Sequence, residues 1–183
     1  KNNQIWIGSN RGLWKVCGEK LVHVASKIIK SHVVSLLHDS HGILYIGTRD
    51  GLYIYKDNKF EHVLLNKDYL SLDNVIRKLC LGSNNQLWII TDSGLLSMTM
   101  SGRKVVRHYK SEYSFNTICR VDKYLYLGTT NQGLIRFDIS SSQFTPFMSL
   151  GFAVISSLSS DGKDILYVGT DGLGVKFISI KKK

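Results

Sequence analysis

Runs of apolar residues separated by short turns make up most of the chain. The clearest run, residues 43–46 (ILYI), is followed by a turn that contains Gly51 and by a second apolar run at residues 52–55. A strand with one face in solvent alternates apolar and polar residues, whereas a strand buried on both faces reads as a continuous apolar run. The pattern therefore predicts short antiparallel strands that neighbours cover on both faces.

The same phrase occurs five times along the chain. Its copies read IWIGSNRGLWKV, LYIGTRDGLYIY, LWIITDSGLLSM, LYLGTTNQGLIRF and LYVGTDGLGVKFI, with repeat cores at residues 5–9, 44–48, 87–91, 125–129 and 166–170. A period of about forty residues indicates stacked supersecondary units. Each core ends on Ser or Thr with a glycine directly before it, except that Ile90 replaces the glycine in the third copy. We expect local repacking around Ile90.

Each complete copy predicts four strands, which we call A to D. In the second copy they cover residues 32–38, 43–48, 51–56 and 59–65, and B and C are joined by a tight hairpin turn. We expect an aromatic anchor in each core to pack against the neighbouring unit; the anchors are Trp6, Tyr45, Trp88, Tyr126 and Tyr167. Four-stranded sheets that are buried on both faces and repeat at this spacing are typical of the blades of a β-propeller, and a flat solenoid is the less favoured alternative.

The predicted fold is therefore all-β: a β-propeller of four-stranded antiparallel blades. The first unit has only strands B, C and D, and the last has only A, B and C. These partial units do not combine into one complete blade, so we expect residues 1–183 to form a single β-propeller segment. It would be a partial ring of about four and a half blades, cut from a larger ring.

Composition and charge add little to this picture. The net charge is +10, from 24 basic and 14 acidic residues, and the basic residues are scattered apart from those at the termini. A diffuse positive charge favours anionic partners in general but does not indicate a nucleic-acid footprint, and we expect no nucleic-acid partner. No stretch approaches the roughly 18 apolar residues of a membrane span, and the first residues do not resemble a signal peptide.

The reactive residues follow the repeat instead of converging. His23, His62 and His108 occupy the same D-strand position in three units, where Pro146 stands in the fourth. Cys80 and Cys119 share an A-strand position that Leu and Ser fill elsewhere. No CxxC pair, nucleophile elbow or phosphate loop is present, so the sequence predicts a non-enzymatic chain with no catalytic residue, no metal site and no cofactor.

The phrase L-[WY]-[IVL]-G-T-x-x-G-L, flanked by predicted strands, resembles the two-component regulator propeller repeat. The resemblance covers essentially the whole chain, and the copies lack the Trp-Asp ending of WD40 blades and the double glycine of kelch blades. It implies the periplasmic sensor region of a hybrid two-component system histidine kinase, typical of glycan-degrading Gram-negative bacteria. It also implies signalling through a homodimer, with any contact to a membrane made by segments that flank residues 1–183.

A ligand surface is expected on one rim. In an up-and-down blade the D–A and B–C connections emerge at the same rim, and variation among the copies concentrates there. Planar polar groups and aromatic rings suit a sugar, and the positive charge favours an anionic oligosaccharide. The candidate ligand-binding residues are Arg11, Arg49, Asp50, Tyr69, Tyr113, Asn131 and Gln132. A protein-interaction scaffold without a small-molecule ligand is the alternative.

Overall fold

The computed structural model describes residues 4–83, 85–101 and 104–180. Within these residues, five antiparallel sheets, numbered 1 to 5 in chain order, contain three, four, four, four and three strands. One short 3₁₀ helix, η1 (Leu72–Asn74), precedes sheet 3. The fold class predicted from the sequence, an all-β partial propeller, is confirmed.

Strand order within each sheet follows the chain, so every sheet is a simple meander. Sheet 1 contains β1 (Trp6–Ser9), β2 (Gly12–Cys17) and β3 (Lys20–Val24); sheet 2 contains β4 (Val33–His38), β5 (Leu44–Thr48), β6 (Gly51–Lys56) and β7 (Lys59–Val63). Sheet 3 contains β8 (Ile76–Leu81), β9 (Gln86–Thr91), β10 (Gly94–Thr99) and β11 (Lys104–Tyr109). Sheet 4 contains β12 (Phe115–Val121), β13 (Tyr124–Thr129), β14 (Leu134–Asp138) and β15 (Gln143–Met148), and sheet 5 contains β16 (Ile155–Ser160), β17 (Ile165–Thr170) and β18 (Gly174–Ser179).

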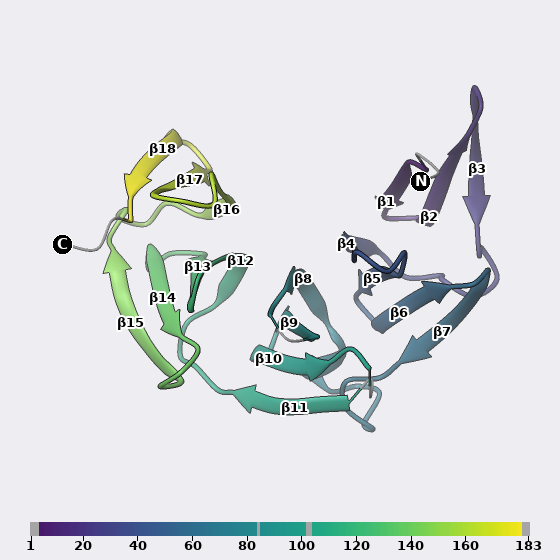
Figure 1. The fold of residues 1–183 in the computed structure, drawn as a ribbon, viewed down its shortest axis with the longest axis horizontal. Coiled ribbons are helices and arrows are strands. Elements are labelled where there is room, and N and C mark those ends of the chain that lie inside the picture. The colour runs from purple at the N-terminus through teal and green to yellow at the C-terminus, as the bar shows by residue number, and fades with distance from the viewer. Residues whose placement is uncertain (1–3, 84, 102–103, 181–183) are drawn as a thin grey trace.

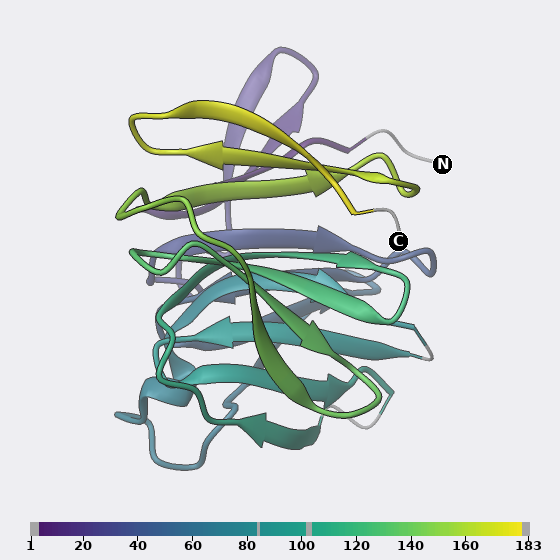
Figure 2. The same ribbon diagram turned by 90° about the vertical axis from the view of Figure 1, so that its left-hand side faces the viewer.

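The five sheets stand side by side in an arc around a common axis (Figure 1). In sheets 2 to 4 the first strand lies nearest the axis and the fourth lies on the outside, and sheets 1 and 5 occupy the two ends of the arc. Turned by 90°, the sheets are stacked edge-on, and their turns gather along two opposite rims (Figure 2). The turns that join second to third strands therefore share a rim with the loops that join successive sheets.

Neighbouring sheets bury their facing surfaces against each other. We call the face toward the next sheet in chain order the forward face and the opposite one the backward face. Four apolar clusters fill the four gaps between sheets, and each joins a forward face to a backward face. The predicted anchors Tyr45, Trp88 and Tyr126 are fully buried on forward faces. Burying a ring of this size removes about 150–250 Å² from water, so these contacts are a main source of inter-sheet stability.

The glycine of the repeat core lets the next sheet approach closely. A Cβ atom added at Gly47 would lie 2.8 Å from Cγ2 of Ile76, the first residue of the next sheet. Ile90, which replaces this glycine in sheet 3, is completely buried in one cluster with Phe115. Phe115 occupies the place that Val33, Ile76 and Ile155 take in the other sheets. The local repacking expected at Ile90 therefore takes place on the following sheet, where the aromatic Phe115 replaces the aliphatic residue found at the same position of the other sheets.

Most predicted strands match the observed ones within one or two residues. The largest difference is in sheet 5: the apolar and small residues 152–160 (FAVISSLSS) predict strand A of the last unit, whereas β16 begins at Ile155. The preceding residues form a loop with an isolated bridge between Leu150 and Phe152, and Phe152 is almost fully exposed. Apolar character alone does not make Phe152 part of a strand, and its side chain remains in solvent.

Candidate functional site

The predicted recognition rim is built on a repeated turn. At the end of each strand that corresponds to strand B of the repeat, a hydroxyl donates a hydrogen bond to the carbonyl of a glycine at the start of strand C. For Thr48 and Gly51 the distance is 2.7 Å. The equivalent pairs are Ser9–Gly12, Thr91–Gly94, Thr129–Gly133 and Thr170–Gly174. The hydroxyl fixes the base of each turn, so the residues at its tip vary without loss of turn geometry.

Four candidate residues lie at the tips of these turns and are exposed. Arg11 follows β1, Arg49 follows β5, and Asn131 and Gln132 follow β13. They belong to three different sheets along the arc, so they form a dispersed row and do not converge on one point (Figure 1). A ligand that touched several of them would have to be extended along the rim.

Asp50 is held by its own turn. Its carboxylate accepts a hydrogen bond from Thr48 Oγ1 at 2.5 Å and one from the Tyr53 hydroxyl at 3.4 Å. Its backbone carbonyl lies 2.8 Å from Nε2 of His62. Burial, together with the charge of Asp50 and the nearby hydroxyl of Tyr69, raises the pKa of Tyr53 to about 12. The structure thus brings the candidates Asp50 and Tyr69 close to Tyr53, although much of the Asp50 carboxylate's bonding capacity serves the turn.

Tyr69 lies on the loop between β7 and β8, which is organised by a buried asparagine. Asn74 Oδ1 accepts hydrogen bonds from the backbone N–H groups of Leu65 (2.8 Å) and Asn66 (3.0 Å). Its Nδ2 donates to the carbonyls of Asn66 at 3.1 Å and Asp68 at 2.8 Å. One side chain therefore supplies partners to both sides of the loop and holds the exposed ring of Tyr69 at the rim.

Asp73 ties this loop to sheet 3. Its carboxylate accepts hydrogen bonds from Asn66 Nδ2 at 2.8 Å and from Ser93 Oγ, and it lies 3.6 Å from Nδ1 of His108. Burial acts to raise the pKa of Asp73, but the hydrogen bonds from Asn66 and Ser93 and the charge of His108 outweigh it and lower that pKa. The carboxylate is therefore stabilised in its charged form beside the turn between β9 and β10.

Tyr113 is the candidate residue that lines a hollow on the predicted rim. A cavity of about 190 Å³ lies between the turn after β9 and the loop before β12, and its polar lining includes Asp92, Ser93 and Glu112. Asp92 is already paired with Arg77, whose Nε lies 2.5 Å from the carboxylate. An aromatic ring beside hydrogen-bonding groups in a shallow hollow suits the apolar and polar edges of a sugar.

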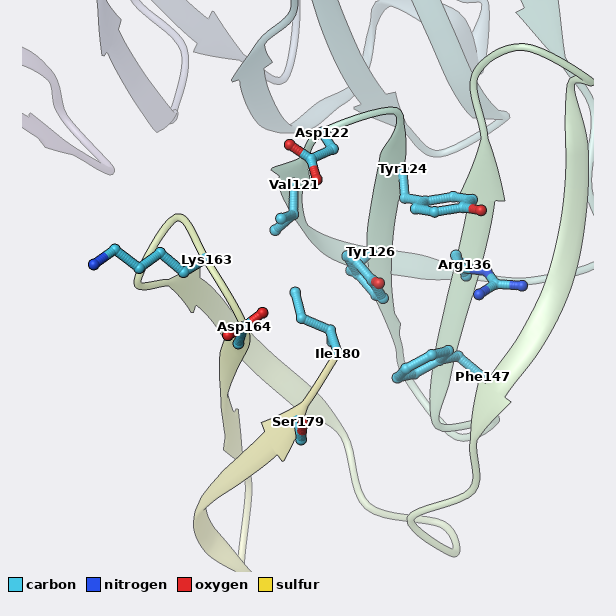
Figure 3. A pocket seen from close by; sticks show the side chains of 10 residues that line it. All are labelled: Val121, Asp122, Tyr124, Tyr126, Arg136, Phe147, Lys163, Asp164, Ser179 and Ile180. Carbon is cyan, nitrogen blue, oxygen red and sulfur yellow. The ribbon is translucent and has the colours of Figure 1, made fainter. Parts of the chain in front are cut away.

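A larger cavity, which the sequence did not predict, lies between sheets 4 and 5 (Figure 3). Its volume is about 630 Å³, and Tyr124, Tyr126, Arg136 and Phe147 form one wall. The guanidinium of Arg136 lies 4.7 Å from the centroid of the Tyr124 ring and 5.7 Å from that of Phe147. The opposite wall is formed by Lys163, Asp164, Ser179 and Ile180 of sheet 5 (Figure 3).

Comparison with the other sheets explains this cavity. In sheets 2 to 4 a fourth strand pairs with the outer edge of the third and places an apolar side chain against the gap between sheets; these side chains are Phe60, Val105 and Phe144. Within the described residues, β18 has no such partner on its outer edge. The cavity therefore lies where a fourth strand packs in the preceding sheets, and it faces the rim opposite to the predicted one. Because it depends on contacts between two sheets, no local sequence pattern indicates it.

The histidines and cysteines are distributed as the repeat predicts. His23 stacks on Trp14 and His62 on Tyr53, with ring centroids 4.3 and 4.2 Å apart, so each histidine is packed within its own sheet. Burial raises the pKa of the Cys80 thiol. Burial and the nearby Cys80 thiol together raise the pKa of the Cys119 thiol to about 11. Among the described residues no group of three or more His, Cys, Asp or Glu side chains could hold a metal ion.

The fold and its repeated inter-sheet contacts define this chain as a β-propeller, present as a partial ring. No family model matches the chain, and a search of curated proteins gave no match. No helix among the described residues has the length and apolar character needed to span a membrane.

Solved structures share the fold. One is the extracellular domain of a protein described as the hybrid two component system BT3049 from B. thetaiotaomicron, with a TM-score of 0.74 and 19% identity over 98% of this chain and 27% of that one. Another is the extracellular domain described as that of the one component system BT4673 from the same organism (TM-score 0.70, 22% identity, 96% of this chain and 26% of that one). The computationally designed Ika8 protein is similar as well, with a TM-score of 0.72 and 13% identity over 98% of this chain and 56% of that one. The chain thus spans about a quarter of the length of the two extracellular domains, and at these identities the likeness is one of fold.

Proposed function

We propose that this chain is part of the extracellular, periplasmic sensor region of a hybrid two-component signalling protein and that it has no enzymatic activity. Two independent observations support the proposal. The five copies of the repeat resemble those of two-component regulator propellers, and the extracellular domains of proteins described as one- and two-component systems share the fold. In this role the sheets form a rigid scaffold, and recognition depends on the loops that they carry.

The ligand in this proposal is an oligosaccharide bound along the rim that carries Arg49, Tyr69 and Tyr113. One observation supports this binding surface: the base of each turn is the same in every sheet, whereas the residues at the tip of the turn differ. Each turn keeps its hydroxyl-to-glycine hydrogen bond, while the tip side chains change from one sheet to the next. Exposed tyrosines supply surfaces on which sugar rings stack, and arginines supply planar donors for hydroxyl or carboxylate groups. The net charge of +10 favours an anionic sugar.

Titration calorimetry of the 183-residue chain against a panel of neutral and anionic oligosaccharides tests this proposal. For a ligand that binds, we expect Arg49→Ala and Tyr69→Ala each to weaken affinity about tenfold, since each removes a contact of roughly 1.4 kcal/mol. Tyr124→Ala, which alters the cavity on the opposite rim, is the matched control and should leave affinity unchanged. If the two rim variants bind every sugar as tightly as the parent, the rim assignment is wrong.

A protein-interaction scaffold is the second candidate, and exposed apolar residues favour it. Leu70 is 86% exposed and Leu72 is 55% exposed, and both lie on the segment between β7 and β8, at the rim of two internal sheets. Apolar side chains that lie together in solvent are typical of contacts with protein. If no sugar of the panel binds, this second candidate becomes the better description of the chain.

A further inference from the structure

A second hollow lies beside the one that Tyr113 lines, and it opens on the outer side of the arc between sheets 3 and 4. Its volume is about 500 Å³, and it lies between the outer strand β11 and the turn that joins β14 to β15 (Figure 1). Residues 107–113 line it from one side, and Ser142, Gln143 and Phe144 line it from the other. Sheets 3 and 4 each have a neighbouring sheet on both sides, so internal sheets form this hollow.

The aromatic rings of this outer hollow are held in place by the core. The ring centroids of Tyr109 and the buried Phe137 are 4.9 Å apart, and those of Phe144 and Phe137 are 4.7 Å apart. The ring of Tyr113 packs near that of the buried Phe115, with centroids 6.1 Å apart. Because buried neighbours anchor these rings, they form a preorganised apolar surface on which a sugar ring can stack.

Two cationic side chains line the same hollow. The guanidinium of Arg107 lies 5.1 Å from the centroid of the Tyr109 ring, and its Nη1 donates a hydrogen bond to Oγ of Ser142 at 3.3 Å. These contacts hold the guanidinium between the two sheets, although Arg107 is exposed. Lys110, on the same side of the hollow, is exposed as well. A guanidinium carries several N–H donors in a planar fork, so the bond to Ser142 leaves donors for a carboxylate or a sulfate.

A short ridge joins the outer hollow to the hollow at the rim. Residues 111–113 line both of them. The backbone N–H of Tyr113 donates a hydrogen bond to Oγ of Ser111 at 3.0 Å, which fixes the turn that the ridge makes. An extended ligand on the rim can therefore cross Tyr113 and enter the outer hollow.

The charge of the lining changes across this ridge. Asp92, which is paired with Arg77, lines the rim hollow, and Glu112 lies on the ridge itself. Arg107 and Lys110 line the outer hollow and not the one at the rim. The carboxylates repel an anionic group at the rim, and the two cations attract it in the outer hollow. The lining therefore favours one orientation of a ligand that has a single acidic end.

We propose that the outer hollow binds the acidic group of an oligosaccharide, a carboxylate or a sulfate, while the neutral part of the sugar crosses Tyr113 to the rim. Arg107 binds the acidic group through its planar N–H donors, and Lys110 adds a second positive charge. The sugar part of this inference rests on the proposed function. Binding of a small anion by Arg107 and Lys110 does not depend on it, so the two can be tested separately.

An NMR titration of the isotope-labelled chain with sodium sulfate and with galacturonate tests the anion site alone. Sodium chloride at the same ionic strength serves as the reference. We expect the backbone shifts to concentrate at residues 107–113 and 142–144 and to be lost in Arg107→Ala. Lys104→Ala is the matched control, since Lys104 is an exposed cation of the same strand that does not line the hollow. Shifts that spread evenly over exposed lysines and arginines would overturn the proposal, as would shifts that Arg107→Ala leaves unchanged.

Calorimetry with three tetrasaccharides tests the oligosaccharide itself and separates the two acidic groups. The sugars are a galacturonic acid tetramer, its neutral methyl ester and a sulfated galactose tetramer. For an acidic tetramer that binds, Arg107→Ala and Lys110→Ala should each weaken affinity about three- to tenfold, because each removes a charged partner of the acidic group. Neither variant should change the affinity of the methyl ester. Glu112→Gln should tighten binding of the acidic tetramer about twofold, since it removes a repelling charge.

The outcomes distinguish this inference from the proposed function. If the acidic tetramers and the methyl ester bind equally well, and Arg107→Ala weakens none of them, sugar binding at the rim stands and the role of the outer hollow is wrong. If no tetramer binds but sulfate or galacturonate still shifts residues 107–113, the anion site stands and oligosaccharide binding is wrong. Circular dichroism should be the same for all variants, because Arg107, Lys110 and Glu112 are exposed.

Discussion

Gly128 lies so close to Ile155 that a Cβ atom on the glycine would be 2.5 Å from Cγ2 of the isoleucine and 2.8 Å from its Cβ. Gly128 is in the second strand of sheet 4 and Ile155 begins sheet 5, so the contact sets the spacing between the two sheets. We expect Gly128→Ala to lower the free energy of unfolding by about 1–3 kcal/mol, the usual cost of overpacking. Urea denaturation followed by tryptophan fluorescence measures this change.

The same contact predicts coupling between the two positions. In an Ile155→Ala background the Cγ2 methyl is gone, so Gly128→Ala should cost less there than in the parent chain. Additive costs in the double-mutant cycle would show that the clash with Ile155 is not the cause.

Asn74 is expected to determine the order of the loop that carries Tyr69. Asn74→Ala leaves the backbone N–H groups of Leu65 and Asn66 without their partner, which should cost about 1–3 kcal/mol. Limited proteolysis should then cut the chain between residues 66 and 73 faster than in the parent. Asn131→Ala, at an exposed tip, is the control and should change neither measurement. Unchanged proteolysis of the Asn74 variant would mean that other contacts hold the loop.

Asp73 should make stability dependent on pH in the acidic range. Its pKa in the folded chain is lower than the value of 3.8 that is normal for the free side chain, so the folded state binds the proton less tightly than the unfolded state does. The stabilisation is therefore complete above about pH 4 and is lost as pH falls through the folded-state pKa. Urea midpoints of the parent and of Asp73→Asn should differ clearly at about pH 6, and the difference should shrink as pH falls below about 4. A constant difference across this range would show that ionisation of Asp73 is not involved.

The three cysteines should differ in reactivity. Cys17 is exposed, whereas burial raises the pKa of Cys80 and of Cys119, the latter to about 11. The reactive thiolate is therefore rare at pH 8 at these two positions, which are partly buried. Mass spectrometry after a short treatment with iodoacetamide should show one fast modification, at Cys17, which Cys17→Ser removes. Fast labelling of Cys119 in the folded chain would contradict its raised pKa.

The internal repeat made the fold predictable, because five copies constrain one another. The third strand of sheet 2 was predicted from Gly51 to Lys56 and is observed there, since the turn glycine and the apolar run define both ends. The exchange of glycine for Ile90 also indicated repacking, but the sequence did not identify Phe115 as the side chain that accommodates it.

The candidate site was less predictable. The rim tips could be located from the turns, and Arg11, Arg49, Asn131 and Gln132 are indeed exposed. The loop around Tyr69 could not be anticipated, because Asn74 shapes it through hydrogen bonds to Leu65 and to residues 66 and 68, and such bonds leave no periodic pattern. Oligosaccharide binding by these residues stays a prediction.

The repetition of one interface between all the sheets also bears on how such chains change in evolution. A sheet touches little beyond the units on either side of it, so duplication or loss of one unit in the gene joins two surfaces that already match. Unequal recombination between copies can therefore alter the number of units in one event, without any further substitution. The sequence differences at the turn tips then accumulate on a framework whose length is itself free to change.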